Sequence, residues 1–233
     1  SPGIRSHMPD STAASAASAP AGQASASASR IRTSGDSEVG TYLEIAEARE
    51  PGQIFTPAPN APEAVVVLDY GSQYSMLIAR RIREAGVYSE LVPWDSKPEQ
   101  LNHLRIKGFV LSGGPASVYE ADAPTLPSYV IASQLPVLGI CYGMQLLAHS
   151  LGGRVAPAAH REYGHAVITV SDTDNPLLRG LPASMPVWMS HGDHVVDLPQ
   201  GFRSVAYSES SPVAVMADAS GHLGIQFHPE VVH

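Results

Sequence analysis

One cysteine, Cys141, occurs among the 233 residues of the chain. A single thiol excludes an intrachain disulfide, and with ten histidines but no second cysteine it also argues against a thiolate-rich zinc site. We therefore expect no metal in this chain. Because a free thiol persists in a reducing compartment, we expect the protein to be cytoplasmic.

Basic residues and long apolar runs are also scarce. Lys and Arg number 14 against 22 Asp and Glu, so the formal net charge is −8, which does not favour binding to a nucleic-acid phosphate backbone. No run approaches the roughly eighteen apolar residues of a membrane-spanning helix. Apolar residues nevertheless make up 44% of the chain, enough for a sizeable core. The composition predicts a globular protein with no nucleic-acid or membrane partner.

Large apolar side chains are nearly absent from residues 1–30, which are mostly Ala and Ser. Such a segment buries too little surface to offset the entropy of ordering it. Its opening, residues 1–8, resembles the remnant of an expression tag. Residues 41–50 favour a short helix, and residues 51–62 are typical of a linker. We therefore divide the chain into an appendage, residues 1–62, and a folded domain, residues 63–233.

Alternating strands and helices are predicted from Ala64 onward. The run at 64–68 is continuously apolar, as in a strand buried on both faces, and residues 72–85 have helical spacing. Further strands are predicted at 88–92, 109–111 and 137–140, with a helix at 142–151. Short strands then follow at 166–170, 187–189, 205–207, 213–216 and 223–226. This order predicts an α/β fold: a doubly wound, mostly parallel sheet with helices on both faces and extra antiparallel strands.

Gly139-Ile-Cys-Tyr-Gly143 lies between a predicted strand and a predicted helix and has the form G-x-C-x-G. It is the cysteine version of the nucleophile elbow, whose sharp turn presents the central side chain above the sheet. The free N–H groups and the dipole at the start of the helix favour a thiolate. A buried structural cysteine is the simpler alternative. The strand–turn–helix context instead favours Cys141 as a nucleophile.

A thiolate nucleophile needs a base and an oxyanion hole, and other strand ends offer both. Ligands of open α/β sheets bind beyond these carboxyl ends. The QFHPE segment places His228 and Glu230 two residues apart, so Glu230 can orient the imidazole and stabilise its cation. The backbone N–H of Tyr142 supplies one oxyanion donor. The SGGP segment at 112–115 can supply the second, for which we choose Gly114.

The SGGP loop, the GxCxGxQ elbow and the HPE segment, in that order, together resemble the class I, or triad, glutamine amidotransferases. The resemblance covers roughly residues 64–233. It implies that Cys141 attacks the side-chain amide of glutamine to form a glutamyl thioester. It also implies that His228 protonates the leaving ammonia and then activates water, while Glu230 orients His228. Gln145, one helical turn beyond the nucleophile, matches a position that contacts the substrate in this family.

Other segments resemble the amidotransferase domains of GMP synthases in particular. They are LDYGSQY at 68–74, ARR at 79–81, CYGMQ at 141–145, REYG at 161–164 and WMSHGD at 188–193. The resemblance implies that the last segment lines the glutamine pocket, with Asp193 on the α-ammonium group and the backbone of Ser190 and His191 nearby. A solvated loop aspartate is the simpler interpretation. His191 and His194 are spaced like metal ligands, but no third ligand is evident, so we reject a metal there.

The sequence also departs from that family. Tyr70 stands where phenylalanine is usual, and the helix that normally closes the domain is missing. The ATP-pyrophosphatase domain with its SGGxDS phosphate loop is absent as well. The resemblance implies that ATP and Mg bind in that absent domain, which uses the ammonia to aminate XMP to GMP. We therefore expect a truncated domain or a separate subunit that needs no cofactor itself and hydrolyses L-glutamine for an ATP-pyrophosphatase partner.

Three other functions stay open. A glutaminase of anthranilate, carbamoyl phosphate or CTP synthase is disfavoured by the REYG and WMSHGD segments. A γ-glutamyl hydrolase or a peptidase of related architecture would lack the HPE ending. A glutamine-binding regulatory module without turnover would not need the intact Cys–His–Glu set.

Overall fold

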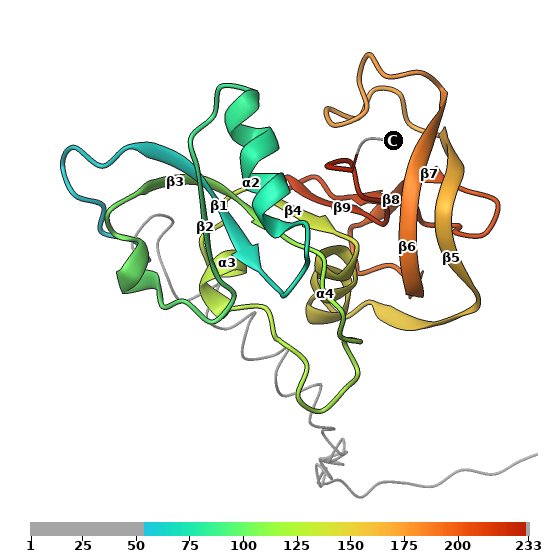
Figure 1. Ribbon diagram of the computed structural model, residues 1–233, viewed down its shortest axis with the longest axis horizontal. Coiled ribbons are helices and arrows are strands. Elements are labelled where there is room, and N and C mark those ends of the chain that lie inside the picture. The colour runs from blue at the N-terminus through green and yellow to red at the C-terminus, as the bar shows by residue number, and fades with distance from the viewer. Residues whose placement is uncertain (1–53, 232–233) are drawn as a thin grey trace, which may run out of the picture. The chain divides into compact units, whose positions relative to one another are not determined.

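The apolar run predicted at 64–68 forms a central strand of one mixed sheet in a computed structural model that describes residues 54–231 (Figure 1). The strands are β1 (Glu63–Asp69), β2 (Ser89–Pro93), β3 (Arg105–Leu111), β4 (Val137–Ile140), β5 (Arg154–Val170), β6 (Ser184–Asp197), β7 (Arg203–Tyr207), β8 (Val215–Ala217) and β9 (His222–Ile225). The helices are α2 (Ser75–Glu84), α3 (Ser128–Ala132) and α4 (Tyr142–Ser150), with a 3-10 helix η1 (Pro98–Leu101). The helix predicted at 41–50 lies outside the described residues.

Five strands form a parallel half of the sheet, in the order β2-β1-β3-β4-β9. This is a flavodoxin-like order, in which the carboxyl ends of the strands share one edge. At that edge β1 leads into Tyr70, β3 into Ser112 and β4 into Cys141. The Tyr70 N–H donates to the Ser112 hydroxyl at 2.9 Å, which ties two of these strand ends together. The predicted doubly wound α/β fold is confirmed.

Four strands form the antiparallel half, in the order β8-β7-β5-β6. Strands β5 and β6 make a hairpin of 17 and 14 residues, although the sequence predicted only short strands at 166–170 and 187–189. Exposed and less exposed positions alternate along β5 from 161 to 168, but apolar residues such as Tyr163 and Val167 occupy exposed positions, so polar and apolar residue types do not alternate in the sequence. Residues 158–161 of β5 also have no paired residue in β6, because the pairing passes from Pro157–Asp193 directly to Glu162–His191.

Alternate residues of the parallel strands pack into two cores, one on each face of the sheet. Val66 and Leu68 of β1 belong to the same core as Leu147 of α4. Val67, between them, packs with Ile78 of α2 in the other core. Because side chains alternate along a strand, helices on both faces require an apolar residue at every position. This explains why β1 could be recognised as a continuous apolar run.

Residues 54–62, interpreted above as part of a linker, lie against the domain. Ile54 and Phe55 are partly buried against the first core. The Phe55 ring meets Tyr129 of α3 edge-on, with ring centroids 5.8 Å apart, and the Ala58 N–H donates to the Asn102 carbonyl at 3.0 Å. The folded unit therefore includes residues upstream of the boundary placed at residue 63. Two adjacent apolar residues in a Pro-rich stretch form no periodic pattern, so this packing could not be predicted from the sequence.

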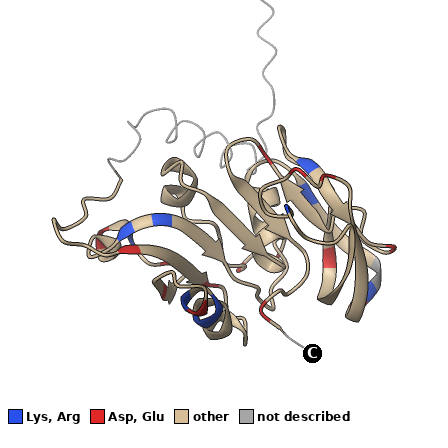
Figure 2. Cartoon of the chain, turned by 90° about the horizontal axis from the view of Figure 1, so that it is seen from above, with Lys and Arg blue, Asp and Glu red and all other residues tan. Residues whose placement is uncertain are grey.

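Acidic and basic residues are interspersed along the described chain, as Figure 2 shows. Within the ARR segment, Ala79 is buried and both arginines bind Glu84 of the same helix at 2.9 Å. Hydrogen bonds from Arg81 and Arg80 lower the pKa of Glu84. The positive charge of this segment is therefore shared with a neighbouring carboxylate. None of the helices within residues 54–231 is long and apolar enough to cross a membrane.

Candidate active site

Cys141 lies at the sharp turn between β4 and α4. Its backbone has φ 52° and ψ −106°, a left-handed conformation that side-chain-bearing residues rarely adopt. A Cβ at Gly139 would lie 2.5 Å from the Gly143 carbonyl oxygen, and a Cβ at Gly143 would collide with the Leu111 carbonyl. Only glycine fits at either position, because strand and helix backbones touch here. The turn thus has the geometry expected of a nucleophile elbow.

The buried Cys141 side chain meets polar groups from two other strands. Its thiol faces the Ser190 carbonyl oxygen of β6 at 3.5 Å. The side-chain N–H of Gln226, just after β9, donates to the sulfur at 3.7 Å. Gln226 was not predicted as a site residue, although it stands in the QFHPE segment. Its contact depends on β9 lying beside β4, which the local sequence does not specify.

His228 and Glu230 form a buried pair beside this cysteine. His228 Nδ1 lies 2.8 Å from Glu230 Oε1, and the two side chains are only 6% and 2% exposed. Burial lowers the pKa of His228, but its interactions with Cys141 and Glu230 together outweigh burial and raise the pKa to about 10. The imidazole is therefore a cation at neutral pH. Cys141 and His228 line one pocket of about 320 Å³ with loop 71–74.

Gly114 and Tyr142, the predicted oxyanion donors, lie beside each other next to Cys141. A Cβ at Gly114 would lie 2.6 Å from the Tyr70 carbonyl oxygen and 3.4 Å from the Tyr142 ring. The Tyr142 hydroxyl donates to the Pro124 carbonyl at 2.7 Å, and burial raises the pKa of Tyr142 to about 12. These contacts hold the loop after β3 against the start of α4. Gly114, Cys141 and Tyr142 all line the same cleft.

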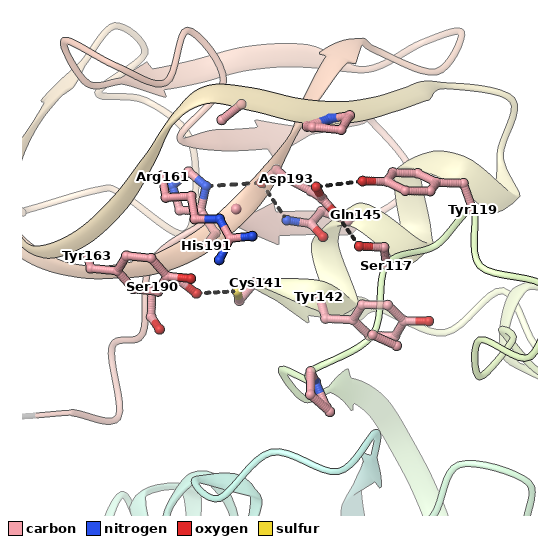
Figure 3. A pocket seen from close by; sticks show the side chains of 16 residues that line it. Ser117, Tyr119, Cys141, Tyr142, Gln145, Arg161, Tyr163, Ser190, His191 and Asp193 are labelled. Atoms are coloured by element: carbon pink, nitrogen blue, oxygen red, sulfur yellow. Dashed lines mark hydrogen bonds between the residues drawn. The ribbon is translucent and has the colours of Figure 1, made fainter.

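That cleft has a volume of about 640 Å³ and is shown in Figure 3. Its polar lining comes from the loop after β3, from the elbow helix and from both strands of the hairpin: Ser117, Tyr119, Cys141, Gln145, Arg161, Tyr163, Ser190, His191 and Asp193. The lining includes a carboxylate, Asp193, and a guanidinium, Arg161. A cleft with both signs of charge suits a small zwitterionic ligand. All the residues predicted to bind substrate are among its lining.

Asp193 lies on β6 at the border of the break in the pairing with β5, not on a loop as the simpler interpretation assumed. It pairs with Pro157, which has no N–H, and the register resumes only at Glu162. The Asp193 carbonyl oxygen instead accepts Gln145 Nε2 at 2.8 Å and faces His191 Nδ1 at 3.0 Å. Register breaks of this kind re-aim side chains next to active sites. Here the break leaves the Asp193 carboxylate in the cleft.

The ring of His191 is buried between protein groups. Its Nε2 lies 3.1 Å from Glu162 Oε2, while its Nδ1 faces the Asp193 carbonyl. Burial lowers the pKa of His191, although Glu162 and the Asp193 carbonyl act in the opposite direction. Because both ring nitrogens face protein oxygen atoms, the backbone of His191 is the part suited to a ligand. Residues 54–231 contain no cluster of three or more His, Cys, Asp or Glu side chains suited to a metal ion.

Ser117 and Tyr119 also contact the site, and the sequence analysis missed both. Their hydroxyls lie 2.5 Å and 2.7 Å from the Asp193 carboxylate. Neither residue belongs to a recognisable motif. Only the path of the loop across the cleft brings them to a strand more than seventy residues away.

The geometry agrees with comparisons against known proteins. A model of the family described as glutamine amidotransferase class-I matches residues 66–233. The chain belongs to the class-I glutamine amidotransferase family. It is a glutamine amidotransferase domain, as the SGGP, GxCxGxQ and HPE segments predicted.

Relatives within this family include GMP synthases. The glutamine-hydrolysing GMP synthase of Thermomicrobium roseum is 62% identical over 178 residues, which cover 75% of this chain and 33% of that protein. The corresponding protein of Dehalococcoides mccartyi strain 195 is 52% identical over 194 residues, covering 82% of this chain and 36% of the relative. The amidotransferase chain thus spans about a third of the length of these curated relatives. The predicted likeness to GMP synthases is confirmed.

Solved structures show the same fold. A Thermoplasma acidophilum protein described as one subunit of a GMP synthase superposes with a TM-score of 0.61 at 31% identity, covering 73% of this chain and 85% of that one. A glutamine amidotransferase of Thermotoga maritima superposes with a TM-score of 0.59 at 24% identity, covering 74% of this chain and 77% of its own. The second likeness supports the fold alone.

Proposed function

We propose that this amidotransferase domain hydrolyses L-glutamine to glutamate and ammonia through a thioester on Cys141. The proposal rests on the strained elbow, which brings the sulfur into a pocket shared with the buried His228–Glu230 pair. The Cys141 thiolate attacks the side-chain amide carbon of glutamine, and the carbonyl electrons move onto oxygen. The tetrahedral adduct then collapses to a thioester and releases the nitrogen as ammonia.

His228 supplies the proton that the departing nitrogen needs. With a pKa of about 10 it is an imidazolium at neutral pH, which is a suitable partner for a thiolate and a suitable acid for the amine. Once neutral, the imidazole takes a proton from water, and the resulting hydroxide attacks the thioester to release glutamate and restore the thiolate. Glu230, bound to Nδ1, holds the ring and stabilises its charged form.

The oxyanion of each tetrahedral adduct is stabilised by the backbone N–H groups of Gly114 and Tyr142. Both residues border Cys141 and the cleft. The tight contact of Gly114 with the Tyr70 carbonyl supports a fixed position for its peptide group. Fixed donors of this kind stabilise the charge that develops in the transition state more than they stabilise the substrate.

Glutamine occupies the larger cleft with its α-ammonium group on Asp193. The backbone of Ser190 and His191 forms the wall between this carboxylate and the sulfur, supported by the Ser190 contact with Cys141. Gln145 lines the cleft and joins the elbow helix to β6 through the Asp193 carbonyl. Binding at these groups places the side-chain amide at the nucleophile.

The ammonia is used by an ATP-pyrophosphatase domain or subunit of GMP synthase, which binds ATP and Mg and aminates XMP to GMP. The relatives are named as GMP synthases and are about three times as long as the segment that matches this chain, which supports the assignment. The REYG and WMSHGD segments support it as well. The glutaminase of anthranilate, carbamoyl phosphate or CTP synthase is the alternative. We place the protein in the cytoplasm, where the Cys141 thiol stays reduced.

The function is tested with 6-diazo-5-oxo-norleucine, a glutamine analogue that alkylates nucleophilic cysteines, and with an assay of ammonia release from glutamine. We expect the label on the peptide that contains Cys141 and glutamate and ammonia in equal amounts. A label on another residue would contradict the nucleophile assignment. Absence of ammonia release, both alone and with an ATP-pyrophosphatase partner, would contradict the glutaminase activity itself.

A further inference from the structure

Two hydroxyl groups from one loop hold the two oxygens of the Asp193 carboxylate (Figure 3). Ser117 Oγ donates to Oδ2 at 2.5 Å, and the Tyr119 hydroxyl donates to Oδ1 at 2.7 Å. Both residues follow β3 and line the cleft with Asp193. They lie 76 and 74 residues from Asp193 in the sequence, so the contact joins the parallel half of the sheet to the hairpin.

We propose that Ser117 and Tyr119 are positioning residues that orient the Asp193 carboxylate toward the α-ammonium group of glutamine. They would thereby set the preference of the cleft for substrates that carry an α-amino group. This inference rests on the proposed function, because it assigns a role within the same glutamine site.

The hydrogen bonds leave the carboxylate able to bind a cation. A carboxylate accepts about four hydrogen bonds, and each hydroxyl occupies one acceptor position on one oxygen. Each oxygen therefore keeps a free position for an ammonium N–H. The backbone of Asp193 is held separately, because its carbonyl accepts the Gln145 amide. With the backbone and the side chain both fixed, little conformational entropy is lost when the ammonium binds.

Tyr119 acts as a donor in this arrangement. The neighbouring Ser117 hydroxyl lowers the pKa of Tyr119, but desolvation and the Asp193 carboxylate together outweigh it and raise the pKa. The phenol therefore keeps its proton at neutral pH. Its side chain is about half exposed, at 51%, so the hydroxyl contributes little by packing, and its removal is expected to change binding more than folding.

The experiment compares glutamine with glutaramate, the same molecule without the α-ammonium group. Ser117→Ala and Tyr119→Phe each remove one hydroxyl, and we expect each to raise the KM for glutamine about tenfold with kcat nearly unchanged. The inhibition constant of glutaramate against glutamine hydrolysis should stay the same. Ser117→Thr keeps a hydroxyl and should retain most of the wild-type KM. Tyr207→Phe, at a similarly exposed tyrosine of β7, is the matched control.

Two outcomes would overturn the inference. An equal rise in the glutaramate inhibition constant would show that the hydroxyls shape the whole cleft and not the ammonium site. An unchanged KM with a lowered Tm would show that they only tie the loop down. If the wild-type chain does not hydrolyse glutamine, the proposed function fails instead. Calorimetric affinities of the same variants for glutamine and glutaramate would then decide the inference separately.

Discussion

The parallel and antiparallel halves of the sheet contribute different parts of the site. Cys141, His228 and Glu230 all follow the carboxyl ends of parallel strands, where the backbone is covered on both faces. Ser190, His191 and Asp193 instead lie within β6 of the hairpin, on either side of the break in its pairing with β5. The groups assigned to bond making thus stand on the most buried part of the fold. The groups assigned to recognition stand on the hairpin, which also carries exposed apolar residues such as Tyr163 and Val167.

This difference predicts that substitutions in the two sets of residues change different kinetic constants. A group that acts only on the reacting bond changes kcat when it is removed, whereas a group that binds substrate equally in ground and transition states changes KM. Substitutions of Cys141, His228 and Glu230 should therefore lower kcat, and substitutions of Asp193 and of the two hydroxyl groups that hold it should raise KM.

The largest effect is expected for Cys141→Ala. Loss of the nucleophile should lower kcat by about a thousandfold or more, because no other thiol exists in the chain to form the thioester. Stopped assays of glutamate formation measure it. Calorimetry should show that the variant still binds glutamine with an affinity close to the wild-type KM. Full turnover by the variant would show that another residue is the nucleophile.

The second effect concerns the partner. We expect an ATP-pyrophosphatase domain of GMP synthase, with its nucleotide and Mg²⁺, to raise kcat of the chain about a hundredfold by aligning His228 with Cys141. The change should appear in kcat, because both residues lie at the parallel edge. Titration of glutaminase activity with the partner measures it. An isolated chain that is already as fast as the mixture would show that the domain is self-sufficient.

The third effect concerns the hairpin. Asp193→Ala should raise the KM for glutamine roughly thirtyfold while lowering kcat less, since the ammonium contact is present in both ground and transition states. Asp197→Ala is a matched control on the same strand, where the carboxylate binds the exposed Arg154 at 2.6 Å. It should leave both constants unchanged. A selective loss of kcat in Asp193→Ala would place this residue in the chemistry and remove the division between the two halves.

The smallest effect is a shift in pH dependence. The pKa of His228 is raised to about 10, so the imidazolium is lost only as the pH rises through that value. Labelling of Cys141 by 6-diazo-5-oxo-norleucine should decline there, because the diazo carbon must take a proton, supplied by His228, before the thiolate displaces nitrogen. Glu230→Gln keeps an acceptor for Nδ1 but removes the negative charge, so the pKa of His228 should fall and the decline should move to lower pH by about one unit. Labelling rates between pH 6 and pH 11 measure this. A decline near the ordinary histidine value in the wild type would contradict the charged pair.

The sequence alone was sufficient for strands β1 and β4 of the parallel half, although it predicted neither α3 nor the place of β9 beside β4. Strands covered on both faces must be apolar at every position, so 64–68 and 137–140 are visible as short runs without any knowledge of their neighbours. The elbow motif is also short in sequence: Gly139 is required by contact with the Gly143 backbone four residues away, although Gly143 is required by the Leu111 backbone of the neighbouring strand β3. His228 and Glu230 are two residues apart, so their pairing also needed no tertiary information.

Only the tertiary structure determined the rest of the site. The hairpin is held by its own long ladder, with exposed and polar positions along it, and therefore lacks the periodic signal that predicts a strand. The gap next to the Asp193–Pro157 pair follows from the register of the two strands, which one sequence does not encode locally. Ser117, Tyr119 and Gln226 reach the site because loops and strands distant in sequence meet at one sheet edge. The residues in each contact are more than seventy positions apart in the sequence. A pattern within one short segment cannot predict such a contact.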